Sequence, residues 1–294
     1  MKAAPFEYSR PASVAEACEL LANDEDARII AGGQTLVPMM AMRLARPTRL
    51  VDISRIPELS FIRDDGDAIV IGAATRQADV EKSGLAARKL PLLALALPWI
   101  GHTATRNRGT VGGSIANADP AAEIPLVLTT LGGSVIARDT GGATTISADD
   151  LFEGPMATAI SPLACLAEAR FPVWTQERVG AAFLEISARK CDFAYVSVAA
   201  QVALDANGRC VTCAIGIGGA TSTPTRLKSA SAALVGLEIN EGYIRAAIAD
   251  EIAALDIMID PHASPAYRRR VAATFALRAL LAANENALRT GARA

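Results

Sequence analysis

The sequence turns at Ala31-Gly32-Gly33-Gln34-Thr35, between an apolar run that ends at Ile30 and a second run that begins at Leu36. This order predicts a strand, a tight turn and the start of a helix. Adjacent glycines permit positive φ and let a ligand approach the backbone without meeting a Cβ. Because the start of a helix leaves N–H groups free, the segment predicts a site for an anionic ligand such as a phosphate.

A second glycine pair stands in Thr110-Val111-Gly112-Gly113-Ser114, followed by Asn117 and Asp119. We interpret it as a second turn, with backbone donors at the glycines and side-chain donors at Thr110, Ser114 and Asn117. Either pair alone is also typical of an ordinary turn, as we interpret the pairs at 132–133, 141–142 and 218–219. Together they predict the two halves of one diphosphate cradle, in a cleft between two subdomains.

Two common phosphate sites are absent from the sequence. No G-x-G-x-x-G follows a strand, which excludes a Rossmann turn, and no Gly-Lys pair occurs, which excludes the phosphate loop of NTPases.

Four segments, in order, resemble the FAD-binding or medium subunit of molybdenum hydroxylases, the family of carbon monoxide, nicotine, quinoline and xanthine dehydrogenases. The first is the A-G-G-x-[ST] turn, and the second is T-[IV]-G-G with A-D-P-A-A-E at residues 118–123. The third is C-D-F-A-Y-V-S-V-A-A at residues 191–200, and the fourth is S-P-A-Y-R-R at residues 264–269. The resemblance runs over nearly the whole chain.

The expected fold class is α+β, because strands precede helices along the chain. The resemblance implies a two-subdomain FAD-binding unit of the vanillyl-alcohol-oxidase-like (PCMH) type, followed by a C-terminal α+β domain with antiparallel strands and helices. We place the FAD-binding domain at residues 1–174, with subdomains at about 1–55 and 56–174. The C-terminal domain takes residues 175–294.

Local patterns predict individual elements. A capping box at Ser13-Val14-Ala15-Glu16 opens a helix, and Pro265 occupies the first position of the last one. Further helices are expected at residues 77–82, 91–100 and 241–254. Strands are expected at residues 27–30, 49–53, 134–137 and 164–167, with hairpins at 59–63 with 68–71 and at 196–204 with 210–217.

The resemblance also assigns cofactor contacts. The diphosphate would lie against the first turn and its neighbours, and the second segment would complete the cradle from the opposite side. Leu166 would lie beside the flavin through its backbone, whereas Ile100 stands where xanthine dehydrogenases place an aromatic ring. The full set is Ile30, Ala31, Gly32, Gly33, Gln34, Thr35, Leu36, Ile100, Thr110, Gly113, Ser114, Asn117, Asp119, Glu123 and Leu166.

Glu123 leaves two interpretations open. In the family an acidic residue at this position accepts hydrogen bonds from FAD hydroxyl groups. An acid in the first turn of a helix is equally explained by the helix dipole. At position 184 the chain has leucine where some relatives carry a lysine, so a charge near the flavin is in doubt.

The implied function is electron transfer. In the family a substrate is hydroxylated at a molybdenum cofactor in a large subunit, and electrons pass through two [2Fe–2S] clusters of a small subunit to this FAD. An external acceptor, which is NAD, a quinone, a cytochrome or oxygen, then receives them. We expect a heterotrimer, commonly doubled, with no catalytic residue or metal ligand in this chain. Two alternatives are a stand-alone FAD-dependent oxidase or reductase and a scaffold that has lost FAD.

Composition agrees with a cytoplasmic protein of 294 residues, with 51% hydrophobic residues and a net charge of −2. That charge gives no reason to expect nucleic acid, and we interpret Arg268-Arg269-Arg270 as a solvated helix face. The uncharged stretch at residues 90–105 contains two prolines and falls short of the roughly 20 residues that span a bilayer. We also see no secretory signal.

The cysteines, at positions 18, 165, 191, 210 and 213, form no disulfide framework. Cys210 and Cys213 have the C-x-x-C spacing of redox and metal sites. Their surroundings favour a strand, in which residues three apart point to opposite faces. Both histidines, His102 and His262, stand alone.

Overall fold

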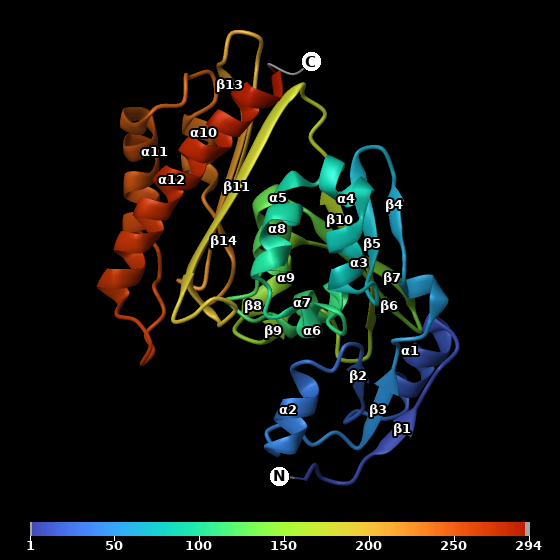
Figure 1. Cartoon of the computed structure of the whole chain (residues 1–294). Helices are drawn as coiled ribbons and strands as arrows, with labels where there is room; N and C mark the ends of the chain where they lie inside the picture. Colours follow the sequence, from blue (N-terminus) through green and yellow to red (C-terminus); the bar gives the residue numbers. More distant parts are fainter. Residues whose placement is uncertain (1, 292–294) are drawn as a thin grey trace.

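The computed structural model describes residues 2–291, which form three units in the order of the sequence. In Figure 1 the N-terminal unit is blue, the central unit is cyan to green, and the C-terminal unit is yellow to red. The mixture of strands and helices confirms the expected α+β class. Within the described residues, no helix is long and apolar enough to cross a membrane.

The N-terminal unit is a small parallel sheet with a helix against it. The strands β1 (Glu7–Ser9), β3 (Arg49–Asp52) and β2 (Arg28–Ile30) lie in that order, and α1 (Val14–Ala22) and α2 (Leu36–Ala41) complete the unit. The hydroxyl of Ser13 accepts a hydrogen bond from the N–H of Glu16 at 3.1 Å, as the capping box predicts. The carboxylate of Glu16 accepts from Ala12 rather than from Ser13.

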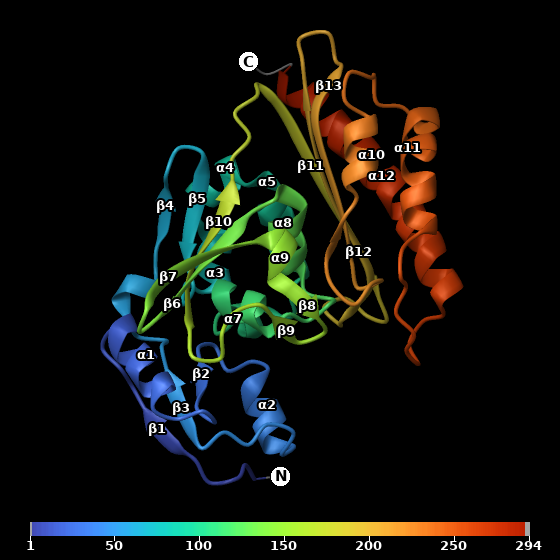
Figure 2. The ribbon, with the colours of Figure 1, turned by 180° about the vertical axis from the view of Figure 1, so that it is seen from behind.

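The central unit is a five-stranded antiparallel sheet covered by helices (Figure 2). The strand order is β4 (Ile62–Asp64), β5 (Ala68–Gly72), β10 (Cys165–Pro172), β6 (Ser134–Asp139) and β7 (Gly142–Ser147). The expected strand at 59–63 is shorter, because Pro57–Leu59 forms the 3-10 turn η1. A two-stranded sheet follows, made of β8 (Phe152–Gly154) and β9 (Ala157–Thr158).

Short helices surround this sheet. They are α3 (Gln77–Lys82), α4 (Gly84–Lys89), α5 (Pro91–Ala96), η2 (Leu97–Trp99), α6 (Thr103–Arg106), α7 (Val111–Asn117), α8 (Glu123–Leu131) and α9 (Ala148–Leu151). The helix predicted at 77–82 is confirmed, and the one predicted at 91–100 is α5 continued by η2. The helix α8 and the strand β7 were not predicted.

The second glycine pair is not a turn, contrary to the sequence prediction. Gly112 and Gly113 lie in the first turn of α7, with the Thr110 hydroxyl as its N-cap. A Cβ on Gly112 would stand 2.4 Å from the Cβ of Ala73, so this glycine lets the helix press against the end of β5. Close packing, rather than a turn, therefore requires glycine at position 112.

The C-terminal unit is an antiparallel sheet between two helical layers (Figure 1). Its strands are β11 (Arg178–Ser187), β12 (Ala194–Leu204), β13 (Cys210–Gly218) and β14 (Thr225–Arg226). One face packs on α10 (Lys228–Ala233), α11 (Glu241–Ala253) and α12 (Pro265–Gly291), and the other face packs on α5 and α8. The β12–β13 hairpin and the last two helices confirm the sequence prediction.

The side chains of β11 alternate between the two cores. Ala181 and Phe183 pack with the central unit, whereas Ala182 and Leu184 pack with the C-terminal helices. Because Leu184 faces the helices, it lies away from the central unit. The C-terminal sheet therefore shares a continuous core with α5 and α8.

Two predictions about side-chain direction are wrong. Arg268 is 2% exposed and donates hydrogen bonds to the carbonyl oxygens of Tyr195 and Gly219, so the arginine run is not a solvated face. Cys210 and Cys213 both point into the helix-covered core, because a β-bulge at Val211 shifts the register of β13 by one residue.

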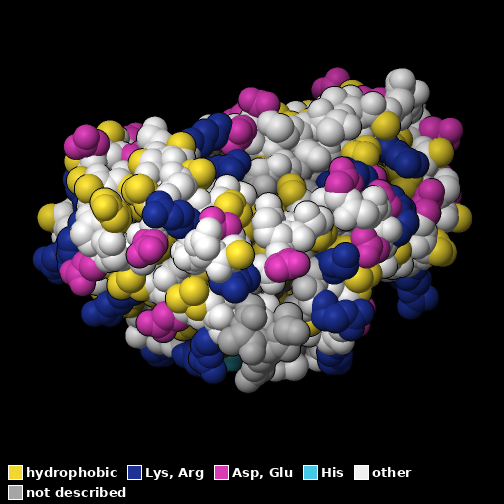
Figure 3. Space-filling view, turned by 90° about the horizontal axis from the view of Figure 1, so that it is seen from above, with side chains coloured by type: hydrophobic (Ala, Val, Ile, Leu, Met, Phe, Trp, Pro, Cys, Tyr) yellow, Lys and Arg dark blue, Asp and Glu magenta, His cyan; other side chains and the backbone are white. Residues whose placement is uncertain are grey.

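Seen from above, side chains of both charges are interspersed on the surface rather than gathered by sign (Figure 3). This distribution agrees with the net charge of −2.

Candidate functional site

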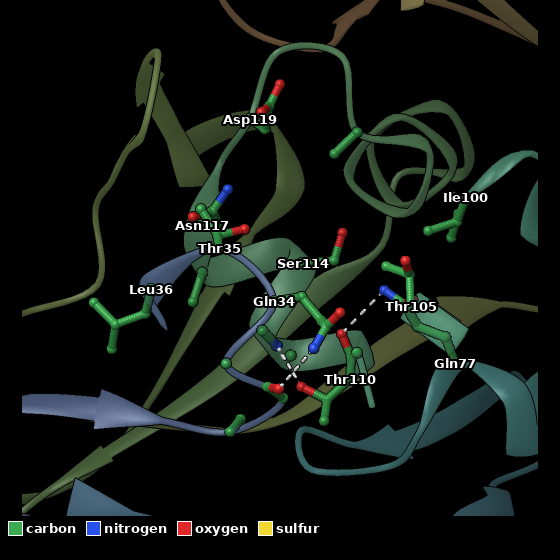
Figure 4. Close-up of a pocket in the computed structure, with 18 of the residues that line it drawn as sticks. Gln34, Thr35, Leu36, Gln77, Ile100, Thr105, Thr110, Ser114, Asn117 and Asp119 are labelled. Carbon is green, nitrogen blue, oxygen red and sulfur yellow. Dashed lines mark hydrogen bonds between the residues drawn. The ribbon is translucent and has the colours of Figure 1, made fainter. Parts of the chain in front are cut away.

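A cavity of about 620 Å³ is lined by residues from all three units. Every residue that the sequence analysis assigned to the cofactor lines it, from Ile30 in β2 to Leu166 in β10. Figure 4 shows Leu36 and Ile100 on opposite sides of the cavity, with Ser114 between them. The tertiary structure thus brings these residues together, while their contacts with a cofactor stay a prediction.

The first glycine turn supplies a row of free backbone donors. Gly33 has φ +69°, a conformation that favours glycine. Within residues 2–291, the N–H groups of Gly33, Gln34, Thr35 and Leu36 have no protein acceptor, whereas the next N–H, of Val37, donates to the carbonyl of Gly33. Four consecutive free N–H groups before a helix are what a diphosphate requires.

The second segment contributes differently from the prediction. The N–H groups of Val111 and Gly112 donate to the carbonyls of Thr75 and Ala73. Those of Gly113 and Ser114 donate to the hydroxyl and the carbonyl of Thr110. The first turn of this segment therefore has no free N–H group, because all four donate hydrogen bonds that hold α7 in place. What the segment presents to the cavity is its side chains and the bare surface of its glycines.

The first glycine turn packs against the two residues that precede the second glycine segment. A Cβ on Gly32 would stand 2.4 Å from the carbonyl oxygen of Arg108 and 2.8 Å from the Cα of Gly109. Real Cβ atoms do not approach backbone so closely, so glycine at position 32 is required for this contact. The donor row of the first turn is thereby fixed against the wall made by the second segment.

The loop between α7 and α8 and the first residue of α8 carry two carboxyl groups into the cavity. Ala118 ends α7 with φ 49°, and the N–H of Ala121 donates to the carboxylate of Asp119 at 2.9 Å. Burial raises the pKa of Asp119. Burial, followed by the charge of Asp119, raises the pKa of Glu123 to about 7.

Both interpretations of Glu123 are compatible with its place. It is the first residue of α8, where the helix dipole favours an acid, and it also lines the cavity. No side-chain hydrogen bond from another described residue occupies its carboxylate. An acceptor is therefore available to hydroxyl groups of a ligand.

Several lining residues escaped the sequence analysis. Phe193, the one aromatic residue among those that line the described cavity, is 77% exposed and follows Cys191 and Asp192 in the loop between β11 and β12. This segment carried part of the family resemblance, yet nothing in it pointed to the cavity. Gln77 also lines the cavity, and its side-chain oxygen is buried without a partner.

The residue set fits FAD. Free amides and a glycine surface suit a diphosphate, Glu123 suits hydroxyl groups, and Ile100, Leu166 and Phe193 offer apolar contacts for a flavin ring. Among the described residues no cluster of three or more His, Cys, Asp or Glu side chains could hold a metal ion.

Family models match most of the chain. Residues 4–174 match the FAD-binding domain in molybdopterin dehydrogenase, and residues 181–283 match the carbon monoxide dehydrogenase flavoprotein C-terminal domain. Two relatives from Paenarthrobacter nicotinovorans are similar in sequence. The 6-hydroxypseudooxynicotine dehydrogenase complex subunit alpha is 39% identical over 95% of each chain. The nicotine 6-hydroxylase medium subunit is 38% identical over 91% of this chain and 93% of the relative.

Two solved structures share the fold. A chain of carbon monoxide dehydrogenase from Hydrogenophaga pseudoflava superimposes with a TM-score of 0.93 at 33% identity, over 97% of this chain and 99% of that one. A chain of quinoline 2-oxidoreductase from Pseudomonas putida 86 superimposes with a TM-score of 0.92 at 34% identity, over 98% of this chain and 100% of that one. Together with the family models, these similarities show that the chain belongs to the FAD-binding medium subunits of the molybdenum hydroxylases.

Proposed function

We propose that this chain is the flavin electron-transfer subunit of a molybdenum hydroxylase, which accepts electrons from [2Fe–2S] clusters of a small partner subunit. FAD can take up and release electrons, while the protein positions it and sets its surroundings. The observation that carries the proposal is the row of four free N–H groups at Gly33–Leu36 inside a cavity lined by all three units.

We propose specific roles for the lining residues. The N–H groups of residues 33–36 donate to the diphosphate, and Gly113 lets it approach α7 without steric hindrance. The carboxylate of Glu123 accepts hydrogen bonds from FAD hydroxyl groups. Ile100, Leu166 and Phe193 exclude water from the flavin, which strengthens the electrostatic interactions inside the cavity.

The domain assignment is part of this proposal. Residues 1–174 would form the FAD-binding domain and residues 175–294 the C-terminal domain. The loop that carries Phe193 belongs to the second domain but lines the cavity, so both domains would be required for complete cofactor binding.

We propose that the chain works in a heterotrimer with a small iron–sulfur subunit and a large molybdenum subunit, which is commonly doubled. An external acceptor would receive the electrons from FAD. No residue of this chain would contact the organic substrate. These finer statements are supported by the relatives, which include a subunit alpha of a dehydrogenase complex and a medium chain of carbon monoxide dehydrogenase.

The test is native mass spectrometry of the complex purified from its natural host, combined with metal and flavin analysis. We expect FAD in this chain, with molybdenum and iron in copurifying subunits. A fully active homomer that contains FAD but neither metal would refute the proposal in favour of a stand-alone oxidase. A chain without any flavin chromophore would instead indicate a scaffold.

A further inference from the structure

Glu185 in β11 is a buried acid without partners. The residue is 8% exposed, and neither oxygen of its carboxyl group has a hydrogen-bond partner among the described residues. An ionised carboxylate without partners is costly to bury, so such a group retains its proton. Nothing in the proposed electron-transfer function uses Glu185.

Its cross-strand neighbour is polar and also lacks a partner. Ser197 lies directly opposite Glu185 in the register of β11 and β12, and it is fully buried with an unpartnered hydroxyl. Buried polar atoms of this kind usually bind ordered water. We call Glu185 and Ser197 the polar seam.

The helix α8, which begins with Glu123, lies close to Ser197. A Cβ on Gly218, which pairs with Ser197, would stand 2.7 Å from the Ser197 hydroxyl and 3.0 Å from Leu126 of α8. Glu123 lies three residues before Leu126, so the two side chains share one face of the helix. This face therefore points toward the sheet near Ser197.

The two acids line different cavities. Glu123 lines the candidate cofactor cavity, whereas Glu185 lines a second cavity of about 610 Å³ together with Pro98, Trp99 and residues 186–190. The two acids are therefore placed at the walls of two separate cavities.

Few other charged groups act on this pair. Asp119 lies beside Glu123, and Arg189 and Lys190 line the second cavity. Among the elements that pack around the two acids, α5, β12 and β13 contain no Asp, Glu, Lys or Arg. In α8, Glu123 is the one residue of these four types. The Tyr195 ring of β12 stacks on His262.

We propose that Glu185 and Glu123 form a proton relay, which moves a solvent proton from the second cavity to the cofactor cavity during flavin reduction. The proposal rests on the proposed electron-transfer function. Reduction of FAD by two electrons at neutral pH takes up one proton, and [2Fe–2S] clusters supply electrons alone. The O–H bond of the Glu185 acid breaks as one forms on the Glu123 carboxylate, through intervening water, because among the described residues no protein group is within hydrogen-bond distance of the Glu185 oxygens. Glu123 then releases that proton to the cofactor, and Glu185 recovers one from water.

The acidities of the two groups agree with this relay. Burial, followed by the charge of Glu123, raises the pKa of Glu185 to about 8, so it holds a proton at neutral pH. The pKa of Glu123 is raised to about 7, chiefly by burial. Groups whose pKa lies near the working pH both accept and release protons readily.

The experiment compares the FAD-loaded full chain with its Glu185→Gln variant. The exposed Glu177 supplies a matched control, Glu177→Gln. Infrared spectroscopy of the oxidised protein detects a protonated carboxylic acid, and a pH indicator follows proton uptake after rapid photochemical reduction of the flavin. In Glu185→Gln we expect the acid band to disappear and proton uptake to slow about 10²-fold, with unchanged FAD content. Glu177→Gln should behave like the wild type.

A conservative variant separates the relay from a packing effect. Glu185→Asp keeps an acid in the polar seam and should recover much of the proton-uptake rate. Wild-type uptake in flavin-loaded Glu185→Gln, or uptake as slow in Glu185→Asp as in Glu185→Gln, would overturn the relay. Absence of bound FAD would overturn the proposed function instead, and the infrared band of Glu185, recorded without flavin, would still test its protonation.

Discussion

The N–H of Gly219 donates a hydrogen bond to the carbonyl oxygen of Pro120 at 2.8 Å, which joins the end of β13 to the loop that carries Asp119 and Glu123. Arg268 of α12 donates to the carbonyl of the same Gly219 and pairs with Asp260. The C-terminal helix is thereby connected through Gly219 to the wall of the candidate cofactor cavity.

We predict that Arg268→Met destabilises the chain by about 3 to 5 kcal/mol, because it leaves the carbonyl groups of Tyr195 and Gly219 without this donor and removes the ion pair with Asp260. It should also weaken FAD binding through the loop at Pro120. Arg270→Met, at an exposed position of the same helix, is the control. Urea unfolding and flavin titration measure the two effects, and equal stability of both variants would contradict the prediction.

Gly32→Ala should prevent FAD binding and reduce stability, since its Cβ would collide with the backbone of Arg108 and Gly109. Gly154→Ala is the matched control, because a Cβ there meets nothing within 4 Å. The bound flavin per chain, measured by absorption, should fall in the first variant alone. A full flavin complement in Gly32→Ala would show that FAD binding does not depend on the close packing of Gly32 against Arg108 and Gly109.

Gly33→Val should abolish FAD binding while leaving much of the fold intact. Its backbone has φ +69°, and the added side chain would meet Val37 at 3.1 Å and occupy the approach of the diphosphate. Gly66→Val introduces similar backbone strain at φ +89°, in open space away from the cavity. This control should lose stability but retain FAD, and retention of full flavin by Gly33→Val would refute the diphosphate assignment.

Glu123→Gln should weaken FAD binding by about 1 to 3 kcal/mol, the usual value of a hydrogen bond to a charged group. Because burial raises the pKa of Glu123 to about 7, the wild-type affinity should increase as the pH rises through that value. The variant should lack this increase, and the exposed Glu153→Gln should keep it. Fluorescence titration between pH 6 and about 8 gives both results, and an unchanged affinity would favour the helix-terminus interpretation.

Glu185 should make the protein less stable at higher pH. Its pKa is raised from the ordinary value of 4.5 to about 8, chiefly by burial, so the folded state holds a proton that the unfolded state releases. The resulting stability is present below pH 4.5 and is lost as the pH rises through about 8, at about 1.4 kcal/mol per pKa unit. Glu185→Gln should show a smaller loss in urea unfolding across this range, and identical pH profiles would disprove the prediction.

The elements that the sequence predicts are those with strong local signals. The capping serine of α1, the hairpin turn at Asn207-Gly208 and Pro265 at the start of α12 all act within a few residues. Predictions failed where a distant segment decides the outcome. The pair Gly112-Gly113 became helical because the carbonyls of Thr75 and Ala73 accept the N–H groups that open α7.

Side-chain direction was likewise beyond the sequence. Cys210 and Cys213 share a face because of one extra residue in a strand, and no local signal at Val211 announces that bulge. Arg268 is buried because two carbonyl oxygens from distant segments and the nearby Asp260 carboxylate converge on it, although a run of arginines usually indicates a solvated surface.

The sequence by itself determined the family, the α+β class and part of the cavity lining, since motifs and helix caps are carried by neighbouring residues. Only the tertiary structure decided how these residues act. It placed Gly32 against Gly109, and it left free N–H groups only in the first glycine turn of the two segments. It also brought Glu185 of β11 beside the helix of Glu123. These relations depend on packing between segments far apart in the chain, where burial and hydrogen-bond partners are set by the whole fold rather than by neighbouring residues.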